Sequence, residues 1–109
     1  MPSTRHQLVT DGSGNGSFTF PVSGHLLYGW FVDVGSLANT ADITVTDDTG
    51  RTLDSATNVA ADGIYLPREA DAGGDSQTDY PPILGNLTFT VAQGGDTVED
   101  CYVTVWTIN

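Results

Sequence analysis

The stretch Leu84–Ile108 reads Leu-Gly-Asn-Leu-Thr-Phe-Thr-Val-Ala, then Gln-Gly-Gly-Asp, then Thr-Val-Glu-Asp-Cys-Tyr-Val-Thr-Val-Trp-Thr-Ile. In its first part Leu87, Phe89 and Val91 alternate with threonines, which is the period of a half-buried strand. The two glycines that follow favour a tight turn, because glycine adopts positive φ without steric cost. The stretch therefore predicts two strands joined as a β-hairpin.

Two expected strands, residues 25–34 and 101–108, are apolar on both faces. A strand of this kind is covered on both sides. One face packs in the core, and the other is available for an oligomer interface, where aromatic side chains are enriched. The candidate interface side chains on these strands are Leu27, Phe31, Tyr102 and Trp106.

Elsewhere, short alternating runs are separated by Gly, Asp and Pro, and no window has the period of a helix. The runs lie at residues 4–10, 17–22, 42–47, 51–54 and 63–66. This pattern predicts an all-β fold, an antiparallel β-sandwich (jelly-roll or Ig-like) of seven to eight short strands. The expected core side chains are Phe18, Phe20, Ile43, Val45, Phe89 and Val91.

The N-terminal segment, residues 1–16, is expected to differ from the single β-sandwich domain formed by residues 17–109. It holds few large apolar side chains and ends in a Gly-rich run that is typical of a hinge. We expect residues 1–11 to form an arm outside the monomer's own core that pairs with a strand edge of a neighbouring subunit. The candidate contact residues of the arm are Arg5, His6, Leu8 and Val9.

The charge balance is strongly acidic, with 14 Asp and Glu residues against three arginines and no lysine, for a net charge of -11. Nucleic acid and anionic membranes are poor partners for such a surface. At molar salt the Debye length is about 3 Å, so dense carboxylates repel one another weakly. The absence of lysine therefore favours a halophilic protein over an ordinary acidic domain. We expect no membrane span, because no apolar run is long enough, and no signal peptide, because residues 1–5 are too polar.

No motif for catalysis or metal binding stands out. Ser, His and Asp residues occur without a nucleophile elbow, and the single cysteine, Cys101, is expected to be a small buried hydrophobe. The long loop at residues 68–82 is expected to be functional or an interaction surface. Its Asp71, Asp75 and Asp79 could hold calcium, but they lack the ordered spacing of a calcium loop. We therefore expect no catalytic residue, no metal site and no cofactor.

Three motifs give a resemblance to a known family. They are Ile-Tyr-Leu-Pro-Arg at 64–68, Pro-Pro-Ile-Leu-Gly-Asn-Leu at 81–87 and Val-Ala-Gln-Gly-Gly at 91–95, followed by a final strand. Together with the strand at 41–48, the pattern resembles small all-β virion proteins encoded among the structural genes of tailed phages. With the acidic composition, the resemblance suggests a tailed virus of a salt-loving, haloarchaeal host.

The resemblance implies a non-enzymatic structural protein of the virion, such as a decoration or cement protein that clamps neighbouring capsid subunits. Its partner would be the major capsid protein or another virion protein. A homotrimer would suit a threefold position on the capsid surface, after assembly in the host cytoplasm. Two alternatives stay open. One is a tail, connector or turret component, and the other is a β-sandwich that binds glycan or calcium at a host surface.

Overall fold

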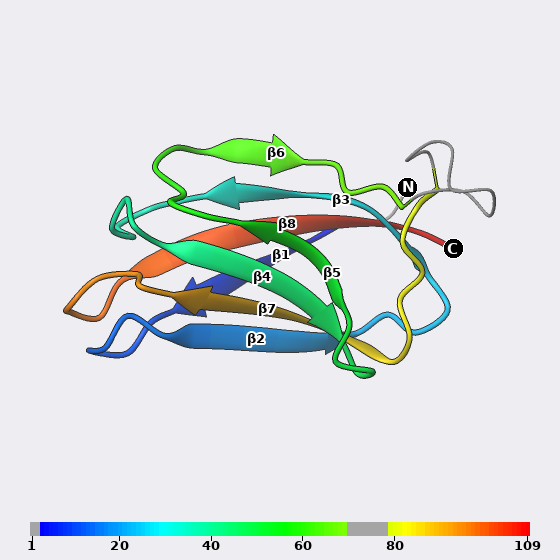
Figure 1. Ribbon diagram of the computed structural model, residues 1–109, viewed down its shortest axis with the longest axis horizontal. Helices are drawn as coiled ribbons and strands as arrows, with labels where there is room; N and C mark the ends of the chain where they lie inside the picture. Colours follow the sequence, from blue (N-terminus) through cyan, green and yellow to red (C-terminus); the bar gives the residue numbers. More distant parts are fainter. Residues whose placement is uncertain (1–2, 70–78) are drawn as a thin grey trace.

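The computed structural model describes residues 3–69 and 79–109, and every regular element in them is a β-strand. The strands are β1 (Ser3–Val9), β2 (Gly16–Pro21), β3 (Leu26–Asp33), β4 (Asp42–Asp47), β5 (Thr52–Ala56), β6 (Gly63–Tyr65), β7 (Asn86–Ala92) and β8 (Asp100–Ile108). They form two packed antiparallel sheets (Figure 1). The predicted all-β sandwich of seven to eight strands is confirmed.

The strand order identifies the type of sandwich. Sheet A has the order β1-β8-β3-β6, and sheet B has the order β2-β7-β4-β5. The first strand thus pairs with the last, the second with the seventh, the third with the sixth, and the fourth with the fifth. This nested pairing is a long hairpin rolled over two sheets, which is the jelly-roll topology.

The expected hairpin between the last two strands is wrong. β7 belongs to sheet B and β8 belongs to sheet A, so residues 93–99 cross from one sheet to the other. A tight hairpin uses a loop of about two residues, whereas this longer connection can cover the roughly 10 Å between packed sheets. Gly94 fixes the crossing, because its N–H donates to Gly14 O (2.9 Å) and its carbonyl accepts from Ala38 N (2.9 Å).

The core lies between the sheets and is centred on Trp30 and Phe89, both 0% exposed. Their rings meet edge to face at 5.5 Å, and Trp30 Nε1 donates to Asp54 Oδ2 (2.9 Å), which satisfies the buried indole. The expected burial of Ile43, Val45, Phe89 and Val91 is confirmed, while Phe18 and Phe20 are half-buried beside the core.

The prediction of an N-terminal arm outside the monomer's core is wrong. Residues 3–9 form β1, which pairs with β8 along its whole length without a register shift. Leu8 is 1% exposed and belongs to the core, and Thr10 N donates to Glu99 O. The alternation of β1 directs His6 and Leu8 inward. These two inward side chains are enough to place the strand in the sandwich, because the final strand supplies the partners for its backbone hydrogen bonds.

A bulge in β3 changes which of its side chains face the core. Leu27 pairs with Thr107 and Gly29 pairs with Trp106, so the register shifts at Tyr28. Tyr28 is therefore an extra residue in β3, and beyond it the inward and outward positions of the strand are exchanged. Leu27 consequently joins Trp30 in the core at 0% exposure, instead of lying on the opposite face as an interface residue.

Candidate interaction face

The outer surface of sheet A carries large apolar side chains. Val103 and Val105 face the core, so the alternation of β8 places Tyr102 and Trp106 on the outer surface, where both are half-buried. In the same way, Phe31 of β3 points outward. We define the sheet A face as Phe31, Ile64, Leu66, Tyr102 and Trp106 together with Arg5.

The apolar members of this face lie in adjoining rows. Trp106 lies opposite Gly29, and a Cβ at Gly29 would approach Leu66 Cδ2 to 2.6 Å, so Leu66 covers this glycine. In the next row Phe31 lies opposite Ile64 of β6. Ile64 is 58% exposed and Leu66 is 48% exposed. These rows therefore form one largely apolar surface, with Thr104 between Tyr102 and Trp106, that the rest of the described chain leaves open.

Arg5 is held at the margin of this surface. Its guanidinium carbon lies 4.0 Å from the centre of the Tyr102 ring, and its Nη2 lies 4.0 Å from Asp33 Oδ2. Tyr102 pairs with Gln7 of β1 on one side and with Asp33 of β3 on the other. The cation thus lies over the Tyr102 ring of β8 and forms only a long, exposed ion pair with Asp33.

The carboxylates of the chain avoid the middle of the sheet A face. Asp33 and Asp100 are the only acidic residues within the four strands of sheet A, and both stand at strand ends. The remaining acids lie in connections or in sheet B. A molecule with a net charge of -11 therefore has one sheet surface that is close to neutral.

The outer surface of sheet B is of the opposite kind. Most of its outward side chains carry a short hydroxyl group, as in the pair Thr19 and Thr88, whose Oγ1 atoms lie 2.8 Å apart. The set is Ser17, Thr19, Thr44, Thr46, Thr52, Ser55, Thr88 and Thr90. Polar outward residues on a solvated antiparallel sheet need no partner.

Four of the eight side chains predicted as interface residues reach the sheet A face or its margin. Arg5, Phe31, Tyr102 and Trp106 form part of the face, and Val9, 49% exposed, lies beyond it at the end of β1. The others point inward: Leu8 and Leu27 are core residues, and the His6 ring stacks at 4.7 and 4.3 Å on Phe18 and Phe20. Burial lowers the pKa of His6.

The sequence reasoning missed Ile64 and Leu66. Their alternation with Tyr65, which stacks on Trp30 at 4.3 Å, was the available signal that they point away from the core.

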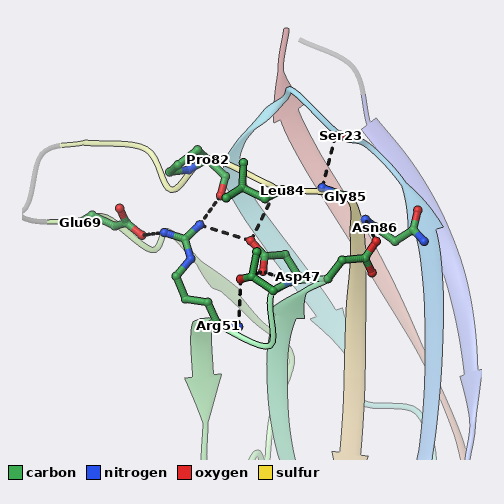
Figure 2. A network of polar contacts seen from close by, with 10 residues as sticks. Ser23, Asp47, Arg51, Glu69, Pro82, Leu84, Gly85 and Asn86 are labelled. Atoms are coloured by element: carbon green, nitrogen blue, oxygen red, sulfur yellow. Dashed lines mark hydrogen bonds and ion pairs between the residues drawn. The ribbon is translucent and has the colours of Figure 1, made fainter.

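A network of polar contacts fixes the base of the long loop next to sheet A (Figure 2). Arg51 donates from Nη1 to Glu69 Oε1 (3.0 Å) and from Nη2 to Pro82 O (2.5 Å). Glu69 and Asp79 exchange two backbone hydrogen bonds of 2.7 and 3.1 Å. The two chain segments that bound residues 70–78 are therefore held together by backbone pairing and by one guanidinium group.

Asp47, whose side chain is 0% exposed, anchors the same network. Its carboxylate accepts from the Thr49 hydroxyl (2.5 Å), and also from Thr49 N (3.0 Å), Leu84 N (3.2 Å) and Arg51 Nη2 (3.3 Å). Burial alone would raise the pKa of Asp47, but these hydrogen bonds outweigh it and hold the pKa below its ordinary value. Next to it, Asp48 Oδ2 accepts from Asn86 N (2.9 Å). The turn after β4 thereby sets the position at which β7 begins.

A hollow of about 480 Å³ adjoins this network. It is lined by Leu26, Glu69, Asp79, Tyr80 and Pro82. The Arg68 guanidinium lies against the neighbouring rings of Tyr80 (4.3 Å) and Tyr28 (5.1 Å), and its Nη1 donates to Tyr28 O (2.7 Å). The hollow thus combines an aromatic ring, two carboxylates and apolar walls. Of the calcium candidates, Asp71 and Asp75 lie outside the described residues.

The described residues contain no group of three or more His, Cys, Asp or Glu side chains placed to hold a metal ion. Cys101 is buried, and burial together with Asp100 and Asp33 raises its pKa to about 11, so the thiol is protonated at neutral pH. His25 Nδ1 lies 3.0 Å from Thr107 Oγ1. Over the same residues, no helix has the length and apolar character of a membrane span.

No protein-family model matches the chain, and no curated protein matches it. Among solved structures, the chain is similar to PliG of Salmonella Typhimurium, a periplasmic lysozyme inhibitor of g-type lysozyme. The two share 17% identity over 96% of this chain and 90% of that chain, with a TM-score of 0.47. A likeness of this size identifies no family and carries no statement about activity or partner.

Proposed function

We propose that this chain is a non-enzymatic structural protein of a halophilic tailed virus, of the capsid decoration type. Its sheet A face binds the major capsid protein or another virion protein, and its acidic remaining surface faces solvent. The protein acts by adding contacts between neighbouring shell subunits. No step of this function requires a cofactor.

The observation that carries the proposal is the apolar and nearly uncharged sheet A face in a chain of net charge -11. An exposed apolar surface of this kind is typical of a protein interface, and aromatic residues are enriched at the centre of such interfaces. Phe31, Tyr102 and Trp106 are half-buried, so a partner would cover the remaining ring surface.

The jelly-roll topology adds support by analogy only. The fold occurs in viral capsid domains and also in lectin and enzyme domains, so the fold alone does not select one function.

The proposal can be tested by quantitative mass spectrometry of virions. The virions would be purified from a haloarchaeal host infected by a virus that encodes the chain. We expect on the order of a hundred or more copies per particle, as for a component that repeats over a symmetric shell. About a dozen copies would instead indicate a connector, turret or tail tip. Absence of the chain from purified particles would overturn the virion role.

A second candidate function is binding of a host-surface glycan. The hollow beside Tyr80 favours it, because aromatic rings stack on sugars and carboxylates such as Asp79 accept their hydroxyl hydrogen bonds. Glycan-array binding that is lost in Tyr80→Ala but kept in Trp106→Ala would select this function over the decoration role.

A further inference from the structure

We propose that a second copy of this chain pairs with β1, so that sheet A continues across a twofold axis into sheet A of the partner. The N-terminal strand is then the edge that receives a neighbour, instead of an arm that is donated to one. The inference does not depend on the virion role, because it concerns the purified protein.

A comparison of the four sheet edges singles out β1. Natural proteins guard exposed edges with short strands, bulges, prolines or charges. β6 has only three residues, β5 meets a register shift on its partner and carries Asp54, and β2 ends in Pro21. β1 has seven residues in unbroken register, contains no proline and carries no carboxylate. β1 therefore has none of these protections except the charge of Arg5, whereas each of the other three edges has at least one.

The outer backbone edge of β1 is open over most of its length. Among the described residues, no hydrogen bond from a turn, loop or side chain reaches the backbone of residues 3–8. At the end of the strand, a Cβ on Gly16 would lie 2.4 Å from Val9 O, so Gly16 covers that carbonyl. The segment Ser3–Gln7 can therefore add a strand without rearrangement of the fold.

The side of the sandwich below this edge shows a partly exposed aromatic seam. His6, Phe18 and Phe20 stack on one another with ring separations of 4.3 to 6.0 Å, and all three are only half-buried. In a twofold β1–β1 pair, the same seam of the second copy lies beside it. The seam is a second feature, independent of the backbone, that a neighbour at β1 would bury.

Charge and symmetry favour a second copy as this neighbour. Two chains of net charge -11 repel, and the β1 edge brings no carboxylate of either strand into the contact. The charge of Arg5 leans away from the edge, over Tyr102 toward Asp33, so the two arginines need not face each other. An antiparallel β1–β1 pair is self-complementary, as a twofold interface requires. It also joins two sheet A faces into one surface.

The test compares two variants that add the same charge. Thr4→Lys places an ammonium group at the open β1 edge, where Thr4 is exposed; Ser55→Lys places it on exposed β5 at the other side of sheet B. Sedimentation equilibrium in molar NaCl should show a wild-type monomer–dimer equilibrium. Thr4→Lys should raise its dissociation constant about tenfold or more, and Ser55→Lys should leave it within about twofold.

Hydrogen exchange of the wild-type protein gives a readout that does not depend on variants. Amides in the peptide that spans residues 3–9 should exchange more slowly as the protein concentration rises through the dimer range. A monomer at all concentrations would overturn the proposal, as would equal weakening by the two variants. Protection of β1 only after a different protein is added would assign the edge to a foreign strand and would also overturn it.

Discussion

The two sheets are built on the same alternation, yet their outer surfaces differ. Sheet B presents Thr and Ser side chains on every strand, and Thr19 and Thr88 bond to each other across its surface. Sheet A presents Phe31, Tyr102 and Trp106 at equivalent outward positions. β-branched threonine suits a solvated sheet, whereas exposed aromatic rings cost free energy in water.

The two sheets differ in their outer surfaces and not in their core residues, so the outer surface is the part that indicates which sheet is suited to bind a partner. Both sheets contribute aliphatic and aromatic side chains of the same kinds to the core. Only the sheet A face combines exposed apolar side chains, an Arg5 that lies over the Tyr102 ring, and strands that are free of carboxylates apart from Asp33 and Asp100 at their ends.

The largest expected effect comes from the core that the two sheets share. Phe89→Ala removes a ring that stacks on Phe18 (5.1 Å) and meets Trp30 edge to face, so it should lower the free energy of unfolding by about 3–5 kcal/mol. Urea unfolding measures this loss. Phe89→Leu is the control and should cost less than about 1.5 kcal/mol. A loss below about 1 kcal/mol for the alanine variant would show that this ring is not central.

A smaller effect is expected from the polar network at one end of the sandwich. Asp47→Asn removes the charge that accepts from Arg51 and Leu84, and it should lower the free energy of unfolding by about 2–3 kcal/mol. Asp96→Asn is the matched control, because Asp96 is exposed and has no hydrogen bond through its side chain among the described contacts. Equal losses in the two variants would contradict the anchoring role of Asp47.

The same carboxylate predicts a dependence of stability on pH. The pKa of Asp47 is lower in the folded state than in the unfolded chain, so the unfolded chain binds more protons at mildly acidic pH. Its contribution is fully present above about pH 4 and is lost as pH falls through the folded pKa. Thermal melting between pH 6 and 3 should therefore decline less steeply in Asp47→Asn than in the wild type. Parallel curves would contradict this assignment.

Salt should act on the acidic surface that surrounds the sheet A face. Dialysis from molar NaCl to about 0.1 M lengthens the Debye distance to about 10 Å, so carboxylates repel more strongly and the melting temperature should fall. Near pH 4.1, the isoelectric point of the sequence, the same dialysis should have a smaller effect. A melting temperature that is unchanged or higher at low salt would remove the argument for a halophilic protein.

The elements of the fold were predictable where the signal is local. The alternation of residues 42–47 and 87–91 gave strands and inward side chains correctly, because the period of a strand depends only on neighbours in the chain. Pairing is not local. The hairpin at Gly94 and the arm at residues 1–11 were wrong because sheet membership depends on strands far away in the sequence.

The candidate site was predictable in part for the same reason. Tyr102 and Trp106 were identified because one strand has apolar residues on both faces, which the sequence alone displays. Leu27 was misplaced because the bulge at Tyr28 has no sequence signature in this strand. Ile64 and Leu66 join the face only through the pairing of the short β6 with β3 and through the contact of Leu66 with Gly29.

The most direct test of the difference between the outer surfaces of sheet A and sheet B is the binding of the purified protein to isolated virus particles. This binding can be measured by co-sedimentation in molar salt. Trp106→Thr gives sheet A a residue typical of sheet B, and Thr88→Ala is the matched change on sheet B; both variants should melt near the wild type. We predict that Trp106→Thr weakens association by about tenfold or more and that Thr88→Ala changes it less than about twofold. Equal effects, or a larger loss for Thr88→Ala, would contradict the assignment of sheet A as the binding face.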